Sequence, residues 1–352
     1  MASGTQTSTA SPPARPAPAQ SPPSAPSSTP RPPLLRLAPL DFSSILAHPD
    51  WVSKAESTEI DRHSFVKGIL DAGDALADSI AGWPAQGTKA VGGKIGGKQK
   101  VDVRVKEVEV GVGGRESWFA RVSEHVEGSG GGQASWEEWE GGLRVNHSQH
   151  ERDYTPDVYD ANEVLVWDQG VLGGLVEEGR EDGEGWVEVG MGIYEMYHHI
   201  PPPLSDRVFP ILLVSARRST SASFIIVQIP LDLSSFPASI QARRHVKNGR
   251  YAGTESGKQG KRLVEGRYVS VERVRKVAVG EGKDGEAGAE KIVWEMATAS
   301  DAGGALPMAV QKMAIPGKIA KDVPLFLDWV ERMRGKVKGE IQSGAEGGGA
   351  AV

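Results

Sequence analysis

Hydrophobic and polar residues alternate with a period of two along much of this chain, above all in its second half. Each alternating or apolar run combines β-branched and aromatic residues and is bounded by turn residues, a pattern that predicts β-strands. The runs are residues 101–110, 118–126, 163–168, 186–199, 207–217, 223–231, 267–277 and 291–300. Because most of the later connections between runs are short, we expect antiparallel pairing.

Helical periodicity appears in three places. Apolar residues recur at helical spacing over 59–83, and 134–155 has helical character, with Ser135 and Glu138 placed as a capping box. Near the C-terminus, one apolar helical face consists of Ile319, Val323, Phe326, Leu327, Val330 and Met333. Since proline is tolerated in the first helical turn, Pro324 predicts a regular helix that begins near Asp322.

These elements predict an α+β fold in which one large, curved antiparallel sheet wraps around the long C-terminal helix. We expect a single domain over 37–338, a disordered Pro/Ser/Ala-rich tail over 1–36 and a disordered Gly/Ala tail over 339–352. Three segments inside the domain are expected to be loops: the Gly/Lys-rich segment 85–99, the polar segment 234–265 and a hairpin loop at 280–290.

Composition narrows the class of protein. The formal net charge is −6, which argues against a nucleic-acid partner. There is no cysteine, so disulfides and thiol catalysis are excluded and a cytoplasmic location is expected. No apolar run approaches 18 residues, so the sequence predicts no membrane-spanning helix. The prolines of the tail disfavour the amphipathic helix that a mitochondrial import signal needs.

Sequence motifs for cofactors and metals are incomplete. The stretch "GGKIGGKQ" at 92–99 resembles a phosphate-binding loop, but Gln99 stands where a magnesium-binding Ser or Thr is needed, so we interpret it as a solvated linker. His147 and His150 lie three apart with Glu151 adjacent, and we interpret them as an exposed helix face. We therefore expect no metal, no cofactor and no assigned catalytic residue.

Charged residues within the strands leave two interpretations open. Glu195, Glu272 and Glu295 could form cross-strand pairs with arginines such as Arg207, Arg273 and Arg275 at solvated sheet edges. Alternatively, one or two of these carboxylates face a cavity and orient a ligand. His198 and His199 are adjacent in a strand, so they point to opposite faces of the sheet.

Four segments resemble a known family. They are "IYEMYHHIPPPLSDRVFPILLV", "GRYVSVERV", "WEMATASDAGGALP" and "IPGKIAKDVPLFLDWVERMR". Together they resemble a fungal domain of unknown function in the START-like (helix-grip, Bet v 1-like) lipid-transfer superfamily. The resemblance implies a helix-grip fold with an internal cavity and a lipid or sterol ligand. Arg207 matches the family's strand-start arginine, and a structural turn is expected at Asp301, Gly303, Gly304 and Pro307, after which 305–317 is expected to form another strand.

The preferred hypothesis is a non-enzymatic carrier of an apolar small molecule or lipid, with transient contact to a membrane surface. The candidate cavity residues are Met191, Ile193, Tyr194, Tyr197, Arg207, Trp294, Glu295, Met296, Phe326, Trp329 and Val330. One alternative is a helix-grip enzyme acting on an apolar small molecule, which requires a histidine or carboxylate facing the cavity. Another is a scaffold with a filled core, whose "RPAPAQSPPSAP" tail binds a proline-reading domain.

Overall fold

The structure is a computed structural model. It describes residues 1, 34–50, 60–111, 114–168, 172, 185–246, 263–279, 289–304 and 306–347. The chain divides into two compact units, residues 1–33 and 34–352. Residues 2–33 of the predicted N-terminal tail, with its proline-rich motif, lie outside the described residues, as do 247–262 and 280–288 of the predicted loops. Leu34 and Leu35, expected in the tail, pack against the core of the second unit.

Ten strands form one antiparallel sheet in the order β1-β2-β3-β10-β9-β7-β6-β5-β4, and the short β8 pairs in parallel with β6. Their bounds are β1 Ala85–Gly92, β2 Lys98–Val110, β3 Gly114–His125, β4 Val158–Val166, β5 Trp186–His198, β6 Arg207–Arg218, β7 Ser223–Pro230, β8 Val264–Glu265, β9 Arg267–Val279 and β10 Ala289–Asp301. The path is open, with β1 and β4 at its ends. The antiparallel sheet predicted from the alternating pattern is confirmed.

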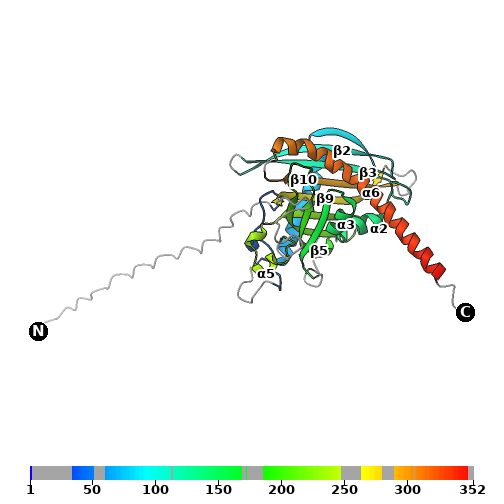
Figure 1. Ribbon diagram of the computed structural model, residues 1–352. Coiled ribbons are helices and arrows are strands. Elements are labelled where there is room, and N and C mark those ends of the chain that lie inside the picture. The colour runs from blue at the N-terminus through cyan, green and yellow to red at the C-terminus, as the bar shows by residue number, and fades with distance from the viewer. Residues whose placement is uncertain are drawn as a thin grey trace. The chain divides into compact units, whose positions relative to one another are not determined.

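The helices cover both faces of this sheet (Figure 1). Their bounds are α1 Arg62–Ser79, α2 Trp136–Trp139, α3 His147–Tyr154, α5 Ala238–Gln241 and α6 Met308–Gly347. Short 3-10 turns occupy Phe42–Ser44, Ile80–Gly82 and Leu233–Ser235, and Glu140–Arg144 forms a π-helical turn. The predicted capping box is present, since Glu138 N donates to Ser135 Oγ and Ser135 N donates to the Glu138 carboxylate.

Alternation within each central strand divides the apolar side chains between two cores. In β7, Ile225 and Val227 pack in the core on the α1 face, whereas Phe224 and Ile226 pack in the core on the α6 face. α1 contacts β6, β7, β9 and β10, and α6 contacts β1, β2, β3 and α3. The strands are nearly continuous apolar runs here because both of their faces are covered. This is the arrangement of a helix-grip fold.

The middle of α6 is fastened to the turn between β1 and β2. The Asp328 carboxylate accepts hydrogen bonds from the backbone N–H groups of Lys94 (2.5 Å), Ile95 (3.0 Å) and Gly96 (3.3 Å). A Cβ on Gly93 would lie 2.6 Å from Asp328 Oδ1, so the backbone can approach the carboxylate only without a side chain. The glycine-rich stretch that resembled a phosphate-binding loop is thus occupied by a carboxylate of the chain itself.

Several segments differ from the sequence-based expectation. Residues 85–92, expected to be loop, form the edge strand β1; its side chains are almost all exposed, so its pairing with β2 produces no apolar alternation. Residues 308–317, expected to be a strand, form the first turns of α6, where Ala, Met, Gln and Lys favour a helix. The same helix continues through 339–347, expected to be a tail, because extending a formed helix avoids the cost of nucleation.

Candidate functional site

A pocket of about 230 Å³ lies between the sheet and α6; we call it the sheet–α6 pocket. Its lining comes from β3, β5, β6, β7, β9 and β10 on the sheet side and from α3, the segment 302–306 and the first four turns of α6 on the other. Apolar lining residues include Phe209, Met296, Ile315 and Ile319. The remaining lining is largely polar, so the pocket combines an apolar wall with hydrogen-bonding groups.

Strand register explains why the polar residues gather in one place. Met296 of β10 lies opposite Arg121 of β3 and opposite Glu272 of β9. Thr298 lies opposite Ser270 in the same way. Because residues two apart in a strand share a face, all of these side chains project from the same side of three neighbouring strands.

Arg121 and Glu272 form a buried ion pair that is built on a tryptophan. The Arg121 guanidinium lies 3.7 Å from the centre of the Trp294 ring, and its Nη2 is 3.4 Å from Glu272 Oε2. Trp294 Nε1 donates to the same Glu272 oxygen at 2.8 Å. The guanidinium is therefore stacked and partly paired, in surroundings where Arg121 is only 1% exposed.

Two carboxyl groups with raised pKa values line the pocket, Glu151 on α3 and Asp322 on α6. Burial, together with the Glu272 and Asp322 carboxylates, raises the pKa of Glu151 to about 8, against a lowering hydrogen bond from Gln228. Burial also raises the pKa of Asp322 to about 7, with Glu272 acting in the same direction and Arg121 in the opposite one. The two carboxyl groups belong to different helices and both line the pocket.

Other lining groups are held neutral. Burial and the Lys318 charge lower the pKa of His198 to about 4. Burial, followed by nearby carboxylates, raises the pKa of the Tyr154 and Tyr268 phenols above their usual value. Among the described residues, Arg121 Nε and Nη1, His198 Nε2 and Tyr268 OH are buried without a hydrogen-bond partner. Such atoms are costly in a folded protein unless something else satisfies them.

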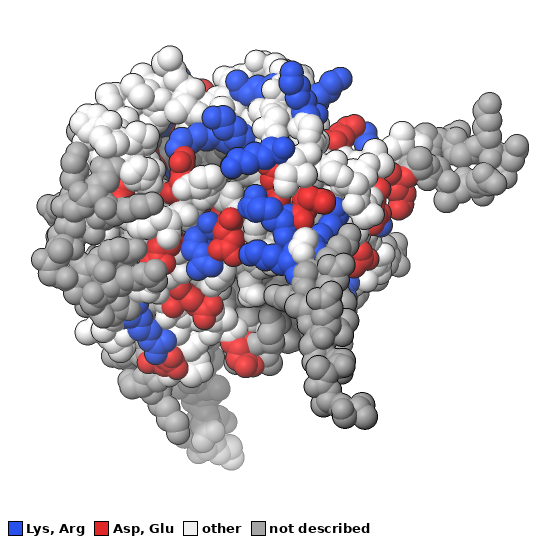
Figure 2. Space-filling view, turned by 45° about the vertical axis from the view of Figure 1, so that its right-hand side comes forward, with Lys and Arg blue, Asp and Glu red and all other residues white. Residues whose placement is uncertain are grey.

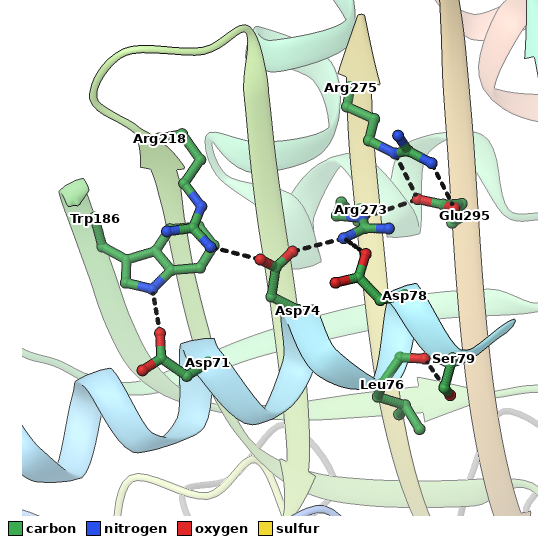
Figure 3. A network of polar contacts seen from close by, with 10 residues as sticks. All are labelled: Asp71, Asp74, Leu76, Asp78, Ser79, Trp186, Arg218, Arg273, Arg275 and Glu295. Carbon is green, nitrogen blue, oxygen red and sulfur yellow. Dashed lines mark hydrogen bonds and ion pairs between the residues drawn. The ribbon is translucent and has the colours of Figure 1, made fainter. Parts of the chain in front are cut away.

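A separate polar network, made of other residues, lies on the opposite face of the same strands (Figure 3). We call it the α1-face network. Arg273 donates to Glu295, Asp74 and Asp78 at 2.7–2.8 Å, and Arg275 also donates to Glu295. Arg218 pairs with Asp74 and stacks 3.7 Å from the Trp186 ring centre, and Trp186 Nε1 donates to Asp71 at 2.9 Å. Glu295 thus pairs with Arg273 and Arg275, as one of the two interpretations allowed, but the expected solvated sheet edge is wrong, because Glu295 is only 7% exposed.

The structure separates the candidate cavity residues into groups. Met296 lines the sheet–α6 pocket, and Trp294 supports it from beneath through Arg121 and Glu272. Phe326, Trp329 and Val330 pack in the α6-face core, further along the helix than the pocket. A ligand contact by these side chains remains a prediction.

Other candidates lie on the far face or at the edges. Met191 and Ile193 pack in the α1-face core, because the odd-numbered positions of β5 point that way. Glu295 belongs to the α1-face network, and the Tyr197 hydroxyl donates to Glu195 at 2.8 Å. Tyr194 lies on the α6 face, where its hydroxyl is 3.5 Å from Glu163.

Arg207 and the segment after β10 form one unit. The Arg207 guanidinium donates to the carbonyl groups of Ser205, Ala302 and Gly303. Asp301 Oδ1 accepts from Gly303 N at 2.9 Å, and Gly303 and Gly304 have φ of 63° and 64°. The carbonyl of Pro307 accepts from the N–H groups of the first turn of α6. These residues join the last strand to the helix directly.

The histidines differ from the sequence interpretation in one respect. His147, expected on an exposed helix face, is only 3% exposed, and its Nδ1 lies 2.7 Å from the Leu143 carbonyl oxygen. The residues around it are polar because they line a buried polar site. His198 faces the pocket, while His199 Nδ1 lies 3.0 Å from Asp206 Oδ1. In the described part of the chain no cluster of His, Asp and Glu has the geometry of a metal site.

Sequence reasoning did not single out Arg121, Glu151 or Asp322. One signal was present for Asp322, which follows Ile315 and Ile319 on the apolar side of the helix at spacings of four and three. A carboxylate on an apolar helical face needs a buried partner or a proton. Arg121 and Glu151 come together with it only through the fold.

Comparison with known proteins gives a family and several distantly similar structures. Human STARD10 has a similar fold at 14% identity, covering 77% of this chain and 83% of that chain, with a TM-score of 0.45. Human StAR-related lipid transfer protein 5 is similar at 10% identity over 75% of this chain and 99% of that one, with a TM-score of 0.43. A STAR-related lipid transfer protein from Xanthomonas axonopodis matches at 12% identity, 71% and 98% coverage and a TM-score of 0.39. At these identities the likeness is one of fold.

No curated protein matches the sequence. None of the helices in the described part of the chain combines the length and apolar character that a membrane span requires. The sequence pattern of a family described as "Protein of unknown function (DUF3074)" matches residues 118–330, from β3 into α6. This match covers more than half of the chain and agrees with the resemblance to a domain of unknown function. The chain therefore belongs to the DUF3074 family.

Proposed function

We propose that the protein binds a hydrophobic ligand of the lipid or sterol class in the sheet–α6 pocket and carries it without altering it. The observation that supports this most is a pocket whose wall is apolar on one side and whose other side includes buried Arg121, with two donor nitrogens lacking a partner. A ligand with an apolar body and a polar end would satisfy both sides. Burial of apolar ligand surface at about 25 cal/mol per Å² would supply most of the affinity.

The size of the pocket sets a condition on this proposal. Its volume of about 230 Å³ is below the roughly 300–1,000 Å³ of typical ligand pockets. A complete lipid or sterol therefore needs further space. The first turns of α6 are the element to supply it, because Ala314 and Ile315 cover the pocket from one side only and Ala309 and Met313 beside them are exposed.

The test is to incubate the purified protein with a cell lipid extract, isolate it again and identify bound lipids by mass spectrometry. Ala314→Phe would place a large side chain in the pocket and is expected to remove the bound lipid. Ala309→Phe is the matched control, because Ala309 lies in the same helix but does not line the pocket. The proposal fails if the unmodified protein enriches no lipid, or if both variants retain it equally.

A second candidate function is acid–base catalysis on an apolar molecule. It is favoured by the two carboxyl groups of Glu151 and Asp322 and by neutral His198, which all face the same pocket. Prolonged incubation with the recovered lipid distinguishes the two functions. A carrier returns the lipid unchanged, whereas an enzyme converts it at a rate that Glu151→Gln lowers.

Contact with a membrane surface would allow such a ligand to enter and leave. The first turns of α6 expose Met308, Val310 and Met313, and the groove beside them is lined by Lys89, Lys106 and Lys312. Lysines and arginines also gather in the upper part of the face shown in Figure 2. Exposed apolar residues beside lysines suit an anionic lipid surface.

Sedimentation with anionic vesicles tests this contact. Val310→Asp is expected to reduce vesicle binding, because Val310 is 50% exposed beside the lysines. Val279→Asp is the control, since Val279 is 49% exposed at the end of β9. Equal binding of the two variants would count against membrane contact through α6.

A further inference from the structure

Three acceptor atoms converge behind the sheet–α6 pocket. His147 Nε2 lies 3.8 Å from Glu151 Oε2 and 4.0 Å from Glu272 Oε1. The Nδ1 of the same ring lies 2.7 Å from the Leu143 carbonyl and must carry the ring proton to bond it. In the neutral ring, Nε2 therefore presents a lone pair toward two carboxyl oxygens at distances beyond a hydrogen bond, so the ring offers neither carboxyl group a donor.

Of the groups that meet there, Glu151 is the one that favours a proton. Glu272 already accepts from Trp294 Nε1 and pairs with Arg121. Burial lowers the pKa of His147, despite the opposing Glu272 charge, so the ring stays neutral. Glu151 faces the same space with no cation among its described contacts, and burial raises its pKa. It is then a neutral carboxylic acid near pH 7.

The remaining charges around the pocket are balanced in pairs. Arg121 on β3 is compensated by Glu272 on β9, and Lys318 on α6 bonds Asp157 at 3.0 Å. Asp322 on α6 lines the pocket next to these groups, and its pKa is raised to about 7. His198 on β5 is neutral, as are the phenols of Tyr154 on α3 and Tyr268 on β9. At about pH 6, where Asp322 is mostly protonated, the polar end thus carries no net charge to offer a ligand.

Its hydrogen-bonding capacity consists mainly of donors. Arg121 is 1% exposed, lines the pocket and has two unpartnered N–H groups. Glu151 and Asp322 add an O–H each when protonated, and the Tyr268 hydroxyl lacks a partner among the described residues. A ligand atom that satisfies these groups must accept hydrogen bonds.

We propose that this polar end selects ligands whose own polar end is an uncharged oxygen acceptor, a hydroxyl or carbonyl, which Arg121, Glu151 and Asp322 hold between them. This inference rests on the proposed ligand-binding function and specifies the class of ligand. It excludes head groups of either charge, negative or positive. A phosphate would add negative charge beside the Glu272 carboxylate, next to a guanidinium that is already paired with it. An ammonium group would meet Arg121 and would have no uncompensated carboxylate to pair with.

The same arrangement makes binding depend on pH. As pH rises through the range in which Asp322 and Glu151 ionise, two donors become anions and the acceptor oxygen of the ligand is repelled. Affinity for an uncharged ligand is therefore expected to fall by about tenfold or more between about pH 6 and about pH 9.

The experiment compares four amphiphiles with the same dodecyl chain, ending in a hydroxyl, a methyl ester, an ammonium or a phosphate. Each displaces a fluorescent apolar probe from the full chain, at about pH 6 and about pH 9. The alcohol and ester are expected to bind at least about tenfold more tightly than the amine and phosphate at the lower pH. The double variant Glu151→Gln with Asp322→Asn keeps neutral donors, so its affinity for the alcohol should no longer fall with pH.

Glu124→Gln is the matched control, because Glu124 is exposed on β3 and pairs with Lys291. A measurement on the unmodified chain guards against a variant that does not fold: infrared spectroscopy should show protonated carboxyl groups that disappear between about pH 6 and about pH 9. Equal or tighter binding of the amine or phosphate overturns the inference, as does the absence of the protonated signal. If no amphiphile binds at all, the proposed ligand-binding function itself fails.

Discussion

Glu272 and Arg273 are neighbours in β9, yet they enter two polar clusters of opposite character on the two faces of the sheet. Each cluster contains an arginine stacked 3.7 Å from a tryptophan ring centre: Arg121 on Trp294 at the pocket, and Arg218 on Trp186 in the α1-face network. In the α1-face network, the charged groups are matched by partners from α1 and the strands. At the pocket, donors are left over, and burial raises the pKa of the Glu151 and Asp322 carboxyl groups.

The difference separates a cluster that holds the fold together from one that, in our proposal, a bound molecule completes. A satisfied buried network fixes α1 on the sheet. An incompletely satisfied one reduces stability unless a ligand completes it. Since adjacent residues of one strand serve both clusters, substitutions on each side can be compared within the same element.

The two clusters should also respond to pH in opposite directions. Burial acts to raise the pKa of Asp74, but hydrogen bonds from Arg273 and Arg218 outweigh it and hold this pKa below its usual value. Its contribution to stability is therefore present above the unfolded pKa and is lost as pH falls through the lower, folded pKa. Glu151 has a raised pKa in the folded state, so the folded protein binds its proton more tightly and loses stability as pH rises toward about 8.

The largest expected effect is on the α1 face. Arg273→Ala removes the shared, buried partner of Asp74 and Glu295 and should lower the free energy of unfolding by about 3–5 kcal/mol, since Asp74 then keeps only Arg218 and Glu295 only Arg275. Urea denaturation at neutral pH measures the change. Arg275→Ala is the control, because that side chain is 38% exposed and should cost about 0–1 kcal/mol. Similar losses for the two variants would contradict the structural role of the α1-face network.

A smaller effect of opposite sign is expected at the pocket. Glu151→Gln should raise the free energy of unfolding by roughly 1–3 kcal/mol at about pH 8, because the variant no longer has to keep a proton on a buried acid. At about pH 5 the stability of the two proteins should be nearly equal. Denaturation across pH provides the measurement. A variant that is destabilised by the same amount at both pH values would show that Glu151 is an ordinary structural residue.

The smallest expected effect concerns the coupling within the pocket. Glu272→Gln removes a negative charge that raises the pKa of both Glu151 and Asp322, so both groups should ionise at lower pH, by roughly half to one unit. Infrared or NMR titration of the carboxyl groups would record the change. Glu295→Gln, on the opposite face of the sheet, should leave this titration in place. A change of the same size in both variants would mean that charges of the α1-face network also determine the pKa values at the pocket.

Much of the sheet was predictable because its central strands are apolar on one or both faces. β6, β7, β9 and β10 are long and regular, and their boundaries agree with the alternating pattern. β1 was not predictable in this way, because an exposed edge strand is held by backbone hydrogen bonds and needs no apolar side chains. The start of α6 was missed since the prolines at 316 and 324, which argue against a helix, are tolerated inside it.

The pocket was harder to predict than the fold. Met191 and Ile193 were apolar strand residues with the right period, but the pattern of β5 is apolar on both faces and does not say which face meets α6. Met296 was identified because its strand alternates with polar residues. Arg121, Glu151 and Asp322 come from three elements far apart in the chain. A single sequence does not show which of these distant elements lie close together in the fold.

The contact between Asp328 and the β1–β2 turn has a practical consequence for anyone who modifies this protein. The stretch "GGKIGGK" looks like a spacer into which a tag, a protease site or a label could be inserted. Its backbone, however, is bonded to α6, and a Cβ on Gly96 would come within 2.6 Å of the Gly132 Cα. Insertions tolerated in a true linker would here detach the hairpin from the helix. The simplest part of the sequence is thus one of the least suitable places for engineering.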